Sequence, residues 1–261
     1  MSLNTKQITE IENVLKKSLR NKFQNYNPEP AIMPFHTRLL GKDRLALYSF
    51  IHSLNTNFGT SIFEPVAIAL ASNKLKEASS QQIAGTQISS KAQQVIQKIM
   101  DNLTTASCMP TKLDEIEQIR KVCSDGDIIK VKPTKVDLKL VGNSEEIYLI
   151  DIKTAKPNAG SFKEFKRTLL EWVAVTLFTN PKADIKTLIA IPYNPYEPNP
   201  YNRWTMRGMI DLDQELKVAE EFWNFLGGDK AYEQLLDCFE RVGMELRREI
   251  DDYFTRFNIK T

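Results

Sequence analysis

The residues best suited to chemistry lie in one segment of the chain, VDLKLVGNSEEIYLIDIKT. The segment contains two runs rich in β-branched and aromatic side chains, separated by Gly-Asn-Ser, and this pattern predicts a β-hairpin. Because side chains alternate along a strand, Asp151 and Lys153 point to one face of the second run, while Asp137 lies on the first run. The hairpin therefore brings two carboxylates and one lysine together. The two predicted strands span residues 136–141 and 147–154.

Asp151 directly follows the apolar run Tyr-Leu-Ile. A carboxylate in such a half-buried strand is costly to desolvate unless a cation or another partner compensates its charge. Hard divalent cations prefer oxygen ligands, which Asp137 and Asp151 can supply together. The sequence therefore suggests a metal site at the hairpin.

The spacing of these three residues resembles the motif of the PD-(D/E)XK nucleases. In that motif a second acidic residue follows the first across a hairpin, here fourteen positions later, and a lysine follows after one further residue. The resemblance implies that Asp137 is the first acid, Asp151 the second and Lys153 the lysine. The proline that opens the family's motif is not adjacent to Asp137, and the nearest one is Pro133. The fold expected is α/β (α+β), a restriction-endonuclease-like core in which helices flank a mixed β-sheet, with additional N- and C-terminal helices.

A third acid, Glu64, precedes the hairpin in a predicted apolar helix that begins near Ser61. Two interpretations of Glu64 stay open. The helix dipole favours a carboxylate at a helix N-terminus, and this alone would explain the residue. Alternatively, Glu64 coordinates metal, because the run NFGTSIFEPVAIALA resembles the helix that supplies an additional acidic ligand in proteins of this kind.

Length and composition are those of a globular protein with one large core. The chain has 261 residues, of which 42% are hydrophobic. Its formal net charge of +2 neither indicates nor excludes a nucleic-acid partner. Three unevenly spaced cysteines fit a reducing compartment, and the sequence shows neither a signal core nor an apolar run of membrane-spanning length. We expect a soluble protein of the prokaryotic cytoplasm without a membrane partner.

Hydrophobic spacing predicts the organisation of the chain. We expect a single domain over residues 1–261, with a helical N-terminal region (about 1–122), a catalytic sheet core (about 123–192), and a recognition loop with C-terminal helices (about 193–261). The predicted helices are 5–26, 39–54, 61 onward, 90–103, 112–122, 162–178 and, broken at Gly227-Gly228, 214–257. Residues 127–133 and 186–192 predict further strands, the first leading towards the hairpin, whereas residues 55–60 and the polar residues 78–92 predict loops.

The predicted helix at residues 162–178 carries a group of basic side chains, Lys163, Lys166 and Arg167. These side chains either contact phosphates or form a solvated basic face, and the sequence leaves both open. Trp172 lies within the apolar stripe of the same helix, so we expect it in the core.

A second unusual stretch is PYNPYEPNPYNRWTMRG, residues 192–208. Its four prolines exclude a regular helix, so it is either a rigid surface loop packed by its own tyrosines or a recognition loop. In the second case Arg203 and Arg207 contact bases or the DNA backbone, because a guanidinium group can bind the edge of a guanine through two hydrogen bonds. The candidates for DNA contacts are Lys156, Asn202, Arg203, Trp204 and Arg207.

Longer stretches resemble the type II restriction endonucleases of the TdeIII group: FHTRLLGKDRLALYSFIHSLNTNFGTSIFEP, YNPYEPNPYNRWTMRGMIDL and KVAEEFWNFLGGDKAYEQLLDCFERVG. The resemblance covers most of the chain, from about Pro34 to the C-terminus. It implies Mg²⁺-dependent cleavage of double-stranded DNA at a short palindrome of the GGNCC type, with the related GGWCC equally open. It also implies a homodimer that places one active site on each strand, and a cognate DNA methyltransferase as a functional, not physical, partner.

In the mechanism expected at the hairpin, the acids bind metal and the lysine acts on the attacking water. One or two Mg²⁺ ions activate a water molecule and stabilise charge on the scissile phosphate. Lys153 orients or deprotonates that water and offsets negative charge in the transition state. The ligands expected for Mg²⁺ are Asp137, Asp151, the carbonyl of Ile152 and Glu64.

Two other functions stay open on the sequence alone. A nuclease of the same fold can act in repair or recombination and cut by DNA structure instead of by sequence. A DNA-binding protein without catalysis is the other alternative, in which Asp137, Asp151 and Lys153 form only a structural ion-pair cluster. A serine hydrolase and an ATP-driven enzyme are disfavoured, because the chain has neither a G-x-S-x-G motif nor a P-loop motif.

Overall fold

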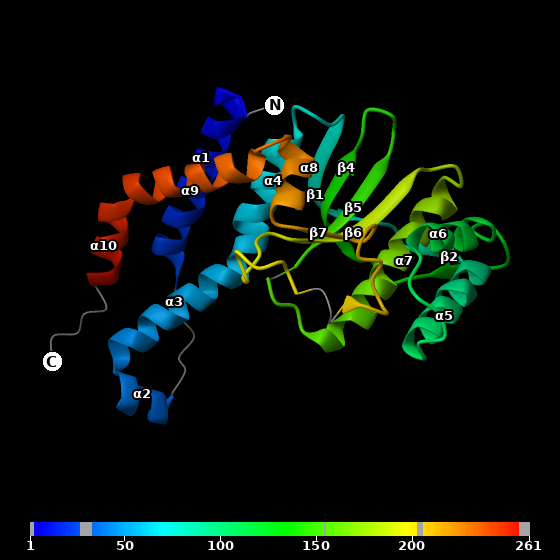
Figure 1. The fold of residues 1–261 in the computed structure, drawn as a ribbon, viewed down its shortest axis with the longest axis horizontal. Coiled ribbons are helices and arrows are strands. Elements are labelled where there is room, and N and C mark those ends of the chain that lie inside the picture. The colour runs from blue at the N-terminus through cyan, green and yellow to red at the C-terminus, as the bar shows by residue number, and fades with distance from the viewer. Residues whose placement is uncertain (1–2, 27–32, 154, 203–205, 256–261) are drawn as a thin grey trace.

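The computed structural model describes residues 3–26, 33–153, 155–202 and 206–255. Its centre is a mixed sheet of five strands in the order β1-β4-β5-β6-β7 (Figure 1). β1, β4 and β5 pair antiparallel, whereas β5, β6 and β7 pair parallel. This sheet, with helices on both sides, confirms the predicted fold class. The strands are β1 (Glu77–Ile83), β4 (Lys135–Val141), β5 (Ile147–Ile152), β6 (Ile185–Ile191) and β7 (Leu216–Val218).

The predicted hairpin forms the middle of the sheet. β4 pairs with β5 so that Leu138 lies opposite Ile150 and Val141 lies opposite Ile147. Burial alternates along β4, as the sequence pattern requires, and Leu138 is fully buried. β5 contributes buried side chains to both faces of the sheet, Leu149 to one and Ile150 to the other, because helices cover both faces.

Two groups of helices make the outer layers (Figure 1). One layer packs on the face that contains Leu138 and Ile150. The other layer packs on the opposite face, and its central helix α7 connects the parallel strands β5 and β6. The first layer contains α1 (Thr5–Asn25), α4 (Glu64–Ala71), α8 (Glu220–Gly227) and α9 (Ala231–Glu245). The second contains α5 (Ser90–Thr104), α6 (Lys112–Arg120) and α7 (Phe162–Thr179).

The remaining helices extend away from the sheet on the side of α1 and α9 (Figure 1). α2 (Pro34–Leu40) is followed by α3 (Lys42–Phe58), which leads through a short π-helical segment, Gly59–Phe63, into α4. α10 (Arg247–Thr255) follows α9. Within the described residues, none of the helices combines the length and the apolar composition needed to cross a bilayer.

Several predictions about loops and the C-terminal region were wrong. Residues 78–92 contain β1 and β2 (Gln87–Ser89), and residues 216–218 form β7 instead of continuing a helix. β1 lies at the edge of the sheet, where exposed positions carry polar residues, so its composition imitates that of a loop. The strand predicted at residues 127–133 is confirmed in part, since Ile128–Lys130 form β3, which precedes β4 in the chain but pairs with β2 in a separate two-stranded sheet.

Residues 55–60 do not form the predicted loop either. They continue the helical backbone of α3, because Gly59 adopts helical dihedral angles (φ −51°, ψ −73°). The break at Gly227-Gly228 is confirmed, since α8 ends there. Trp172 is in the core, as predicted, and its indole N–H donates to Oγ1 of Thr134 at 2.7 Å.

Lys166 is not part of a solvated or phosphate-binding face, and this corrects the prediction made for α7. Its ammonium is fully buried and donates to Oε2 of Glu115 at 2.5 Å and to Oε2 of Glu215 at 2.6 Å. The ammonium of Lys112 donates to Oε1 of Glu215 at 2.6 Å. These four side chains, called the buried charge cluster below, join α6 and α7 to the residue that precedes β7. Lys163, by contrast, is exposed.

Candidate active site

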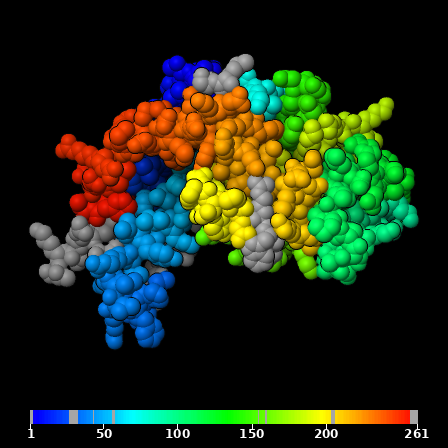
Figure 2. Space-filling model, in the orientation of Figure 1, coloured from blue at the N-terminus to red at the C-terminus, as the bar shows by residue number. Residues whose placement is uncertain are grey.

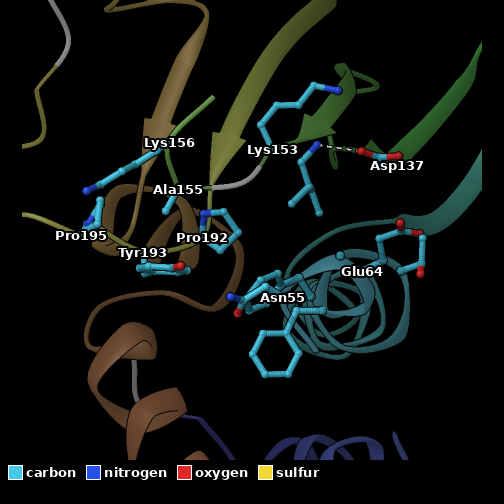
Figure 3. Close-up of a pocket in the computed structure, with 14 residues that line it drawn as sticks. Asn55, Glu64, Asp137, Lys153, Ala155, Lys156, Pro192, Tyr193 and Pro195 are labelled. Atoms are coloured by element: carbon cyan, nitrogen blue, oxygen red, sulfur yellow. Dashed lines mark hydrogen bonds between the residues drawn. The ribbon is translucent and has the colours of Figure 1, made fainter. Parts of the chain in front are cut away.

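A cleft of about 480 Å³ lies at the carboxyl ends of β5 and β6 (Figure 3). One wall is formed by the end of α3 and the π-helical segment, and the other by the residues that follow β5 and β6. Figure 2 shows the surface hollowed between the α2–α3 arm and the segment that follows β6. The polar and charged side chains of the cleft include Asn55, Thr60, Glu64, Asp137, Lys153 and Lys156.

The two aspartates predicted from the hairpin approach each other in the structure. Pairing between β4 and β5 ends at Leu138 and Ile150, and the same register would place Asp137 opposite Asp151. Oδ2 of Asp137 instead accepts a hydrogen bond from the backbone N–H of Ile152 at 2.9 Å (Figure 3). Burial, followed by the nearby charge of Asp151, raises the pKa of Asp137 from its ordinary 3.8 to about 7. The two aspartates therefore lie close enough together for their charges to interact.

Lys153 lies beside Asp151 at the end of β5. Its ammonium lies 2.7 Å from Oδ1 of Asp151 and 4.6 Å from the ring centroid of Phe165 on α7. Its backbone N–H donates to the carbonyl of Ala190 at 2.9 Å, so the parallel pairing of β5 with β6 extends to this position. Phe165 was not identified from the sequence, because its proximity depends on the packing of α7 against the sheet.

Glu64 also faces this site, but not from the free N-terminus of a helix. The π-helical segment precedes it without a break, and the N–H of Glu64 already donates to the carbonyl of Gly59. The interpretation that the helix dipole alone explains Glu64 therefore does not fit, since that effect requires unpaired N-terminal amides. Glu64 is only 3% exposed, and burial raises the pKa of its carboxyl. π-Helical segments of this kind occur frequently at functional sites.

Gln81 on β1 was missed by the sequence reasoning. Its side-chain nitrogen donates to the two carboxylate oxygens of Glu64 at 2.9 Å and 3.0 Å, and lies 3.4 Å from Oδ1 of Asp137. The polar composition of β1 hid the strand, so no signal in the sequence placed Gln81 beside these acids.

The DNA-contact candidates are only partly brought to the cleft. Lys156 lines it, with its ammonium 5.0 Å from the ring centroid of Tyr196. Asn202 and Arg207 are exposed but are not among the described residues that line the cleft. The predictions for two further residues, Arg203 and Trp204, lie outside the described residues.

The oxygen-rich site fits a hard divalent cation. Within the described part of the chain, no three His, Cys, Asp or Glu side chains are close enough to hold one ion together. Mg²⁺ does not require this, because it commonly binds through one or two carboxylates together with water and substrate phosphates. Burial, followed by the charge of Asp151, raises the pKa of Asp137, and a bound cation would favour the ionised form of this carboxyl.

We expect the metal-free protein to lose stability as the pH rises from about 4 to about 7. The pKa of Asp137 is about 7 in the folded protein against an ordinary 3.8, so in this window the folded state binds more protons than the unfolded state. The stabilisation that the protonated Asp137 carboxyl provides is fully present below pH 3.8 and is lost as the pH rises through about 7. Asp137→Asn should flatten the profile and raise the free energy of unfolding at pH 8 by roughly 1–3 kcal/mol.

Urea unfolding in EDTA at several pH values measures this effect. Asp184→Asn is a matched control, because Asp184 is an exposed carboxylate away from the cleft and its replacement should leave the profile unchanged. Equal slopes for Asp137→Asn and the wild-type protein would contradict the assignment.

Comparisons with known proteins identify the family of the chain. The family model described as "Type II restriction endonuclease, HinfI" matches residues 3–243. The type II restriction enzyme MjaII of Methanocaldococcus jannaschii is 24% identical over 226 residues, which cover 82% of this chain and 59% of that enzyme. Two enzymes of Herpetosiphon aurantiacus are similar over more of their own lengths: HgiCII (24% identity, 84% of this chain, 80% of the enzyme) and HgiBI (25% identity, 90% of this chain, 88% of the enzyme).

Proposed function

Because the chain belongs to the HinfI family of type II restriction endonucleases, we propose that it is a site-specific deoxyribonuclease that hydrolyses phosphodiester bonds in double-stranded DNA. The observation that carries this proposal is the convergence of Asp137, Asp151 and Lys153 at the end of β5. The cleft beside them is open to the surface and bounded by polar and aromatic side chains, as a site for a DNA backbone requires.

In this proposal the acids and the lysine have separate roles. Asp137, Asp151, the carbonyl of Ile152 and Glu64 would together hold one or two Mg²⁺ ions, with no more than two of the acids on any one ion; the metal would activate water and offset the charge of the scissile phosphate. Lys153 orients the attacking water and stabilises the negative charge that develops on the phosphate. Its position supports this role, because Asp151 and the ring of Phe165 restrict the ammonium on two sides.

The second wall of the cleft is proposed to hold the DNA strand. Lys156 provides a positive charge on this wall, with its ammonium 5.0 Å from the ring centroid of Tyr196, and phosphate contacts of this kind fix the position of a duplex without reading its sequence. Sequence reading is assigned to a later stretch of the chain, with the candidates Asn202, Arg203, Trp204 and Arg207.

The finer identity rests on the resemblance to the TdeIII group. We propose a palindromic target of the GGNCC or GGWCC type, supported by the three long stretches quoted above. A palindrome has a two-fold axis, so a homodimer with one active site for each strand is the matching assembly. A cognate methyltransferase would protect the host's own sites. In this proposal residues 1–261 act as one domain.

Digestion of a sequenced plasmid that contains every GGNCC variant tests the proposed function. We expect discrete fragments with Mg²⁺ and intact plasmid with EDTA, and the mapped ends give the recognition sequence. A smear, or cleavage only at branched or damaged DNA, would favour a repair nuclease. DNA binding without any cleavage under these conditions would favour a non-catalytic DNA-binding protein.

A further inference from the structure

Gln81 occupies an irregular position in β1, next to Asp137 of β4. On either side of it the two strands pair in register, Ser80 with Leu138 and Gln82 with Val136. Gln81 itself is outside this pairing and has a φ of +55°, in the left-handed region that residues other than glycine rarely adopt. The regular pairing of β1 with β4 is therefore interrupted at the residue whose side chain contacts the candidate active site.

The contacts of Gln81 link acids from two different elements. Its single amide nitrogen serves both oxygens of Glu64, at 2.9 Å and 3.0 Å, and lies 3.4 Å from Oδ1 of Asp137. Glu64 belongs to α4 and Asp137 to β4, so the amide connects a helix and a strand of the cleft. An ionised carboxylate can only accept hydrogen bonds, which fixes the NH₂ end of the amide towards the two acids.

We propose that Gln81 is a positioning residue that holds the carboxylates of Glu64 and Asp137 together in the metal-free protein, and that a divalent cation replaces its amide when the site is loaded. This inference rests on the proposed function, because it takes both acids as ligands of that cation. An amide NH₂ group carries only a partial positive charge, so it can orient the acids and still yield to an ion with two full charges.

The protein of residues 1–261 and three variants of it test this inference. Gln81→Ala removes the amide, and Gln81→Glu replaces it with a third carboxylate. Gln82→Ala is the matched control, because Gln82 is the next residue of the same strand, is exposed, and its amide donates only to the carbonyl of Ser80 at 3.2 Å. Thermal unfolding is measured in EDTA and during titration with CaCl₂, and calorimetry gives the Kd for Ca²⁺.

We expect Gln81→Ala to lower the Tm in EDTA by about 2–6 °C, since the buried Glu64 and the half-buried Asp137 lose a shared donor. This deficit should shrink at saturating Ca²⁺, because the ion then holds the carboxylates. Gln81→Glu should have a lower Tm in EDTA but bind Ca²⁺ about tenfold more tightly than the wild-type protein, since site affinity rises with the number of charged ligands. Gln82→Ala should match the wild-type protein in every measurement.

Two results would overturn the inference alone. One is a Gln81→Ala protein that equals Gln82→Ala in EDTA, and the other is a deficit that stays unchanged at saturating Ca²⁺, which would indicate a purely structural role. A wild-type protein whose Tm and heat signal do not respond to Ca²⁺ would overturn the replacement step together with the metal chemistry of the proposed function. The Ca²⁺ response of the wild-type protein thus separates the two failures.

Discussion

Replacing Lys166 by methionine lowers the free energy of unfolding by about 3–5 kcal/mol. Methionine retains the apolar stem of the side chain but leaves Glu115 without its ammonium partner and Glu215 with Lys112 alone. These side chains are at most 4% exposed, so water cannot replace the lost charge. Burial opposes ionisation of Glu215, yet the charges of the two lysines hold its pKa below the ordinary value. The buried charge cluster is therefore stable only as a complete set.

Urea unfolding at pH 7 measures this change, with Lys163→Met as the matched control. Lys163 lies on the same helix but is exposed, so its replacement should alter the free energy of unfolding by no more than about 0.5 kcal/mol. The double variant Lys166→Met/Glu115→Leu should recover part of the loss, because it also removes the acid that was left unpaired. If Lys166→Met and Lys163→Met unfold at the same urea concentration, the cluster does not have the role assigned here.

The buried charge cluster also connects to the candidate active site. Lys166 follows Phe165 on α7, and the ring of Phe165 lies against the ammonium of Lys153. On the other side of the cluster, Oε2 of Glu215 accepts a hydrogen bond from the backbone N–H of Asp211 at 3.0 Å. The cluster thus fixes both α7 beneath the lysine and the segment between Arg207 and β7. A change in Lys166 would reach the site through this packing even where the protein still folds.

The sequence predicts those contacts of the site that form between residues close together in the chain. A hairpin places residues at equal distances from its turn opposite each other, and strand alternation places residues two apart on one face. Asp137, Asp151 and Lys153 could therefore be brought together from their spacing alone. α7 and the long helix α1 were equally accessible, because their apolar residues recur over many turns.

The rest of the site depends on contacts between distant segments, which leave no periodic signal. Lys166 lies 51 residues from Glu115 and 49 from Glu215, and each lysine taken alone reads as a surface charge. Gln81 lies 56 residues from Asp137, in an edge strand whose polar composition imitates a loop. The π-helical segment before Glu64 likewise carries Gly59, a residue that usually indicates a break.

Two substitutions at the end of β5 test catalysis most directly. Asp151→Asn and Lys153→Ala should each reduce the rate of DNA cleavage by about 10²–10³-fold or more. The first removes a charged ligand for Mg²⁺, and the second removes the ammonium that acts on the attacking water and the phosphate. Cleavage rates are measured with plasmid under single-turnover conditions in Mg²⁺, and binding is measured in Ca²⁺ by gel shift. Lys98→Ala, on the exposed side of α5, is the control and should cleave as the wild-type protein does.

Stability distinguishes this prediction from simple unfolding. The charge of Asp151 helps to raise the pKa of Asp137, so Asp151→Asn relieves a repulsion, and its Tm in EDTA should equal or exceed that of the wild-type protein. The Lys153 side chain is 27% exposed, so water can enter the space that Lys153→Ala opens beside the buried Asp151, and the loss of stability should be smaller than that of Lys166→Met. If both variants keep cleavage within about tenfold of the wild-type rate, the ion pair is structural and the catalytic group lies elsewhere. If cleavage is lost while Tm and DNA binding persist, the residues act on the reaction itself, because neither folding nor substrate affinity then accounts for the loss.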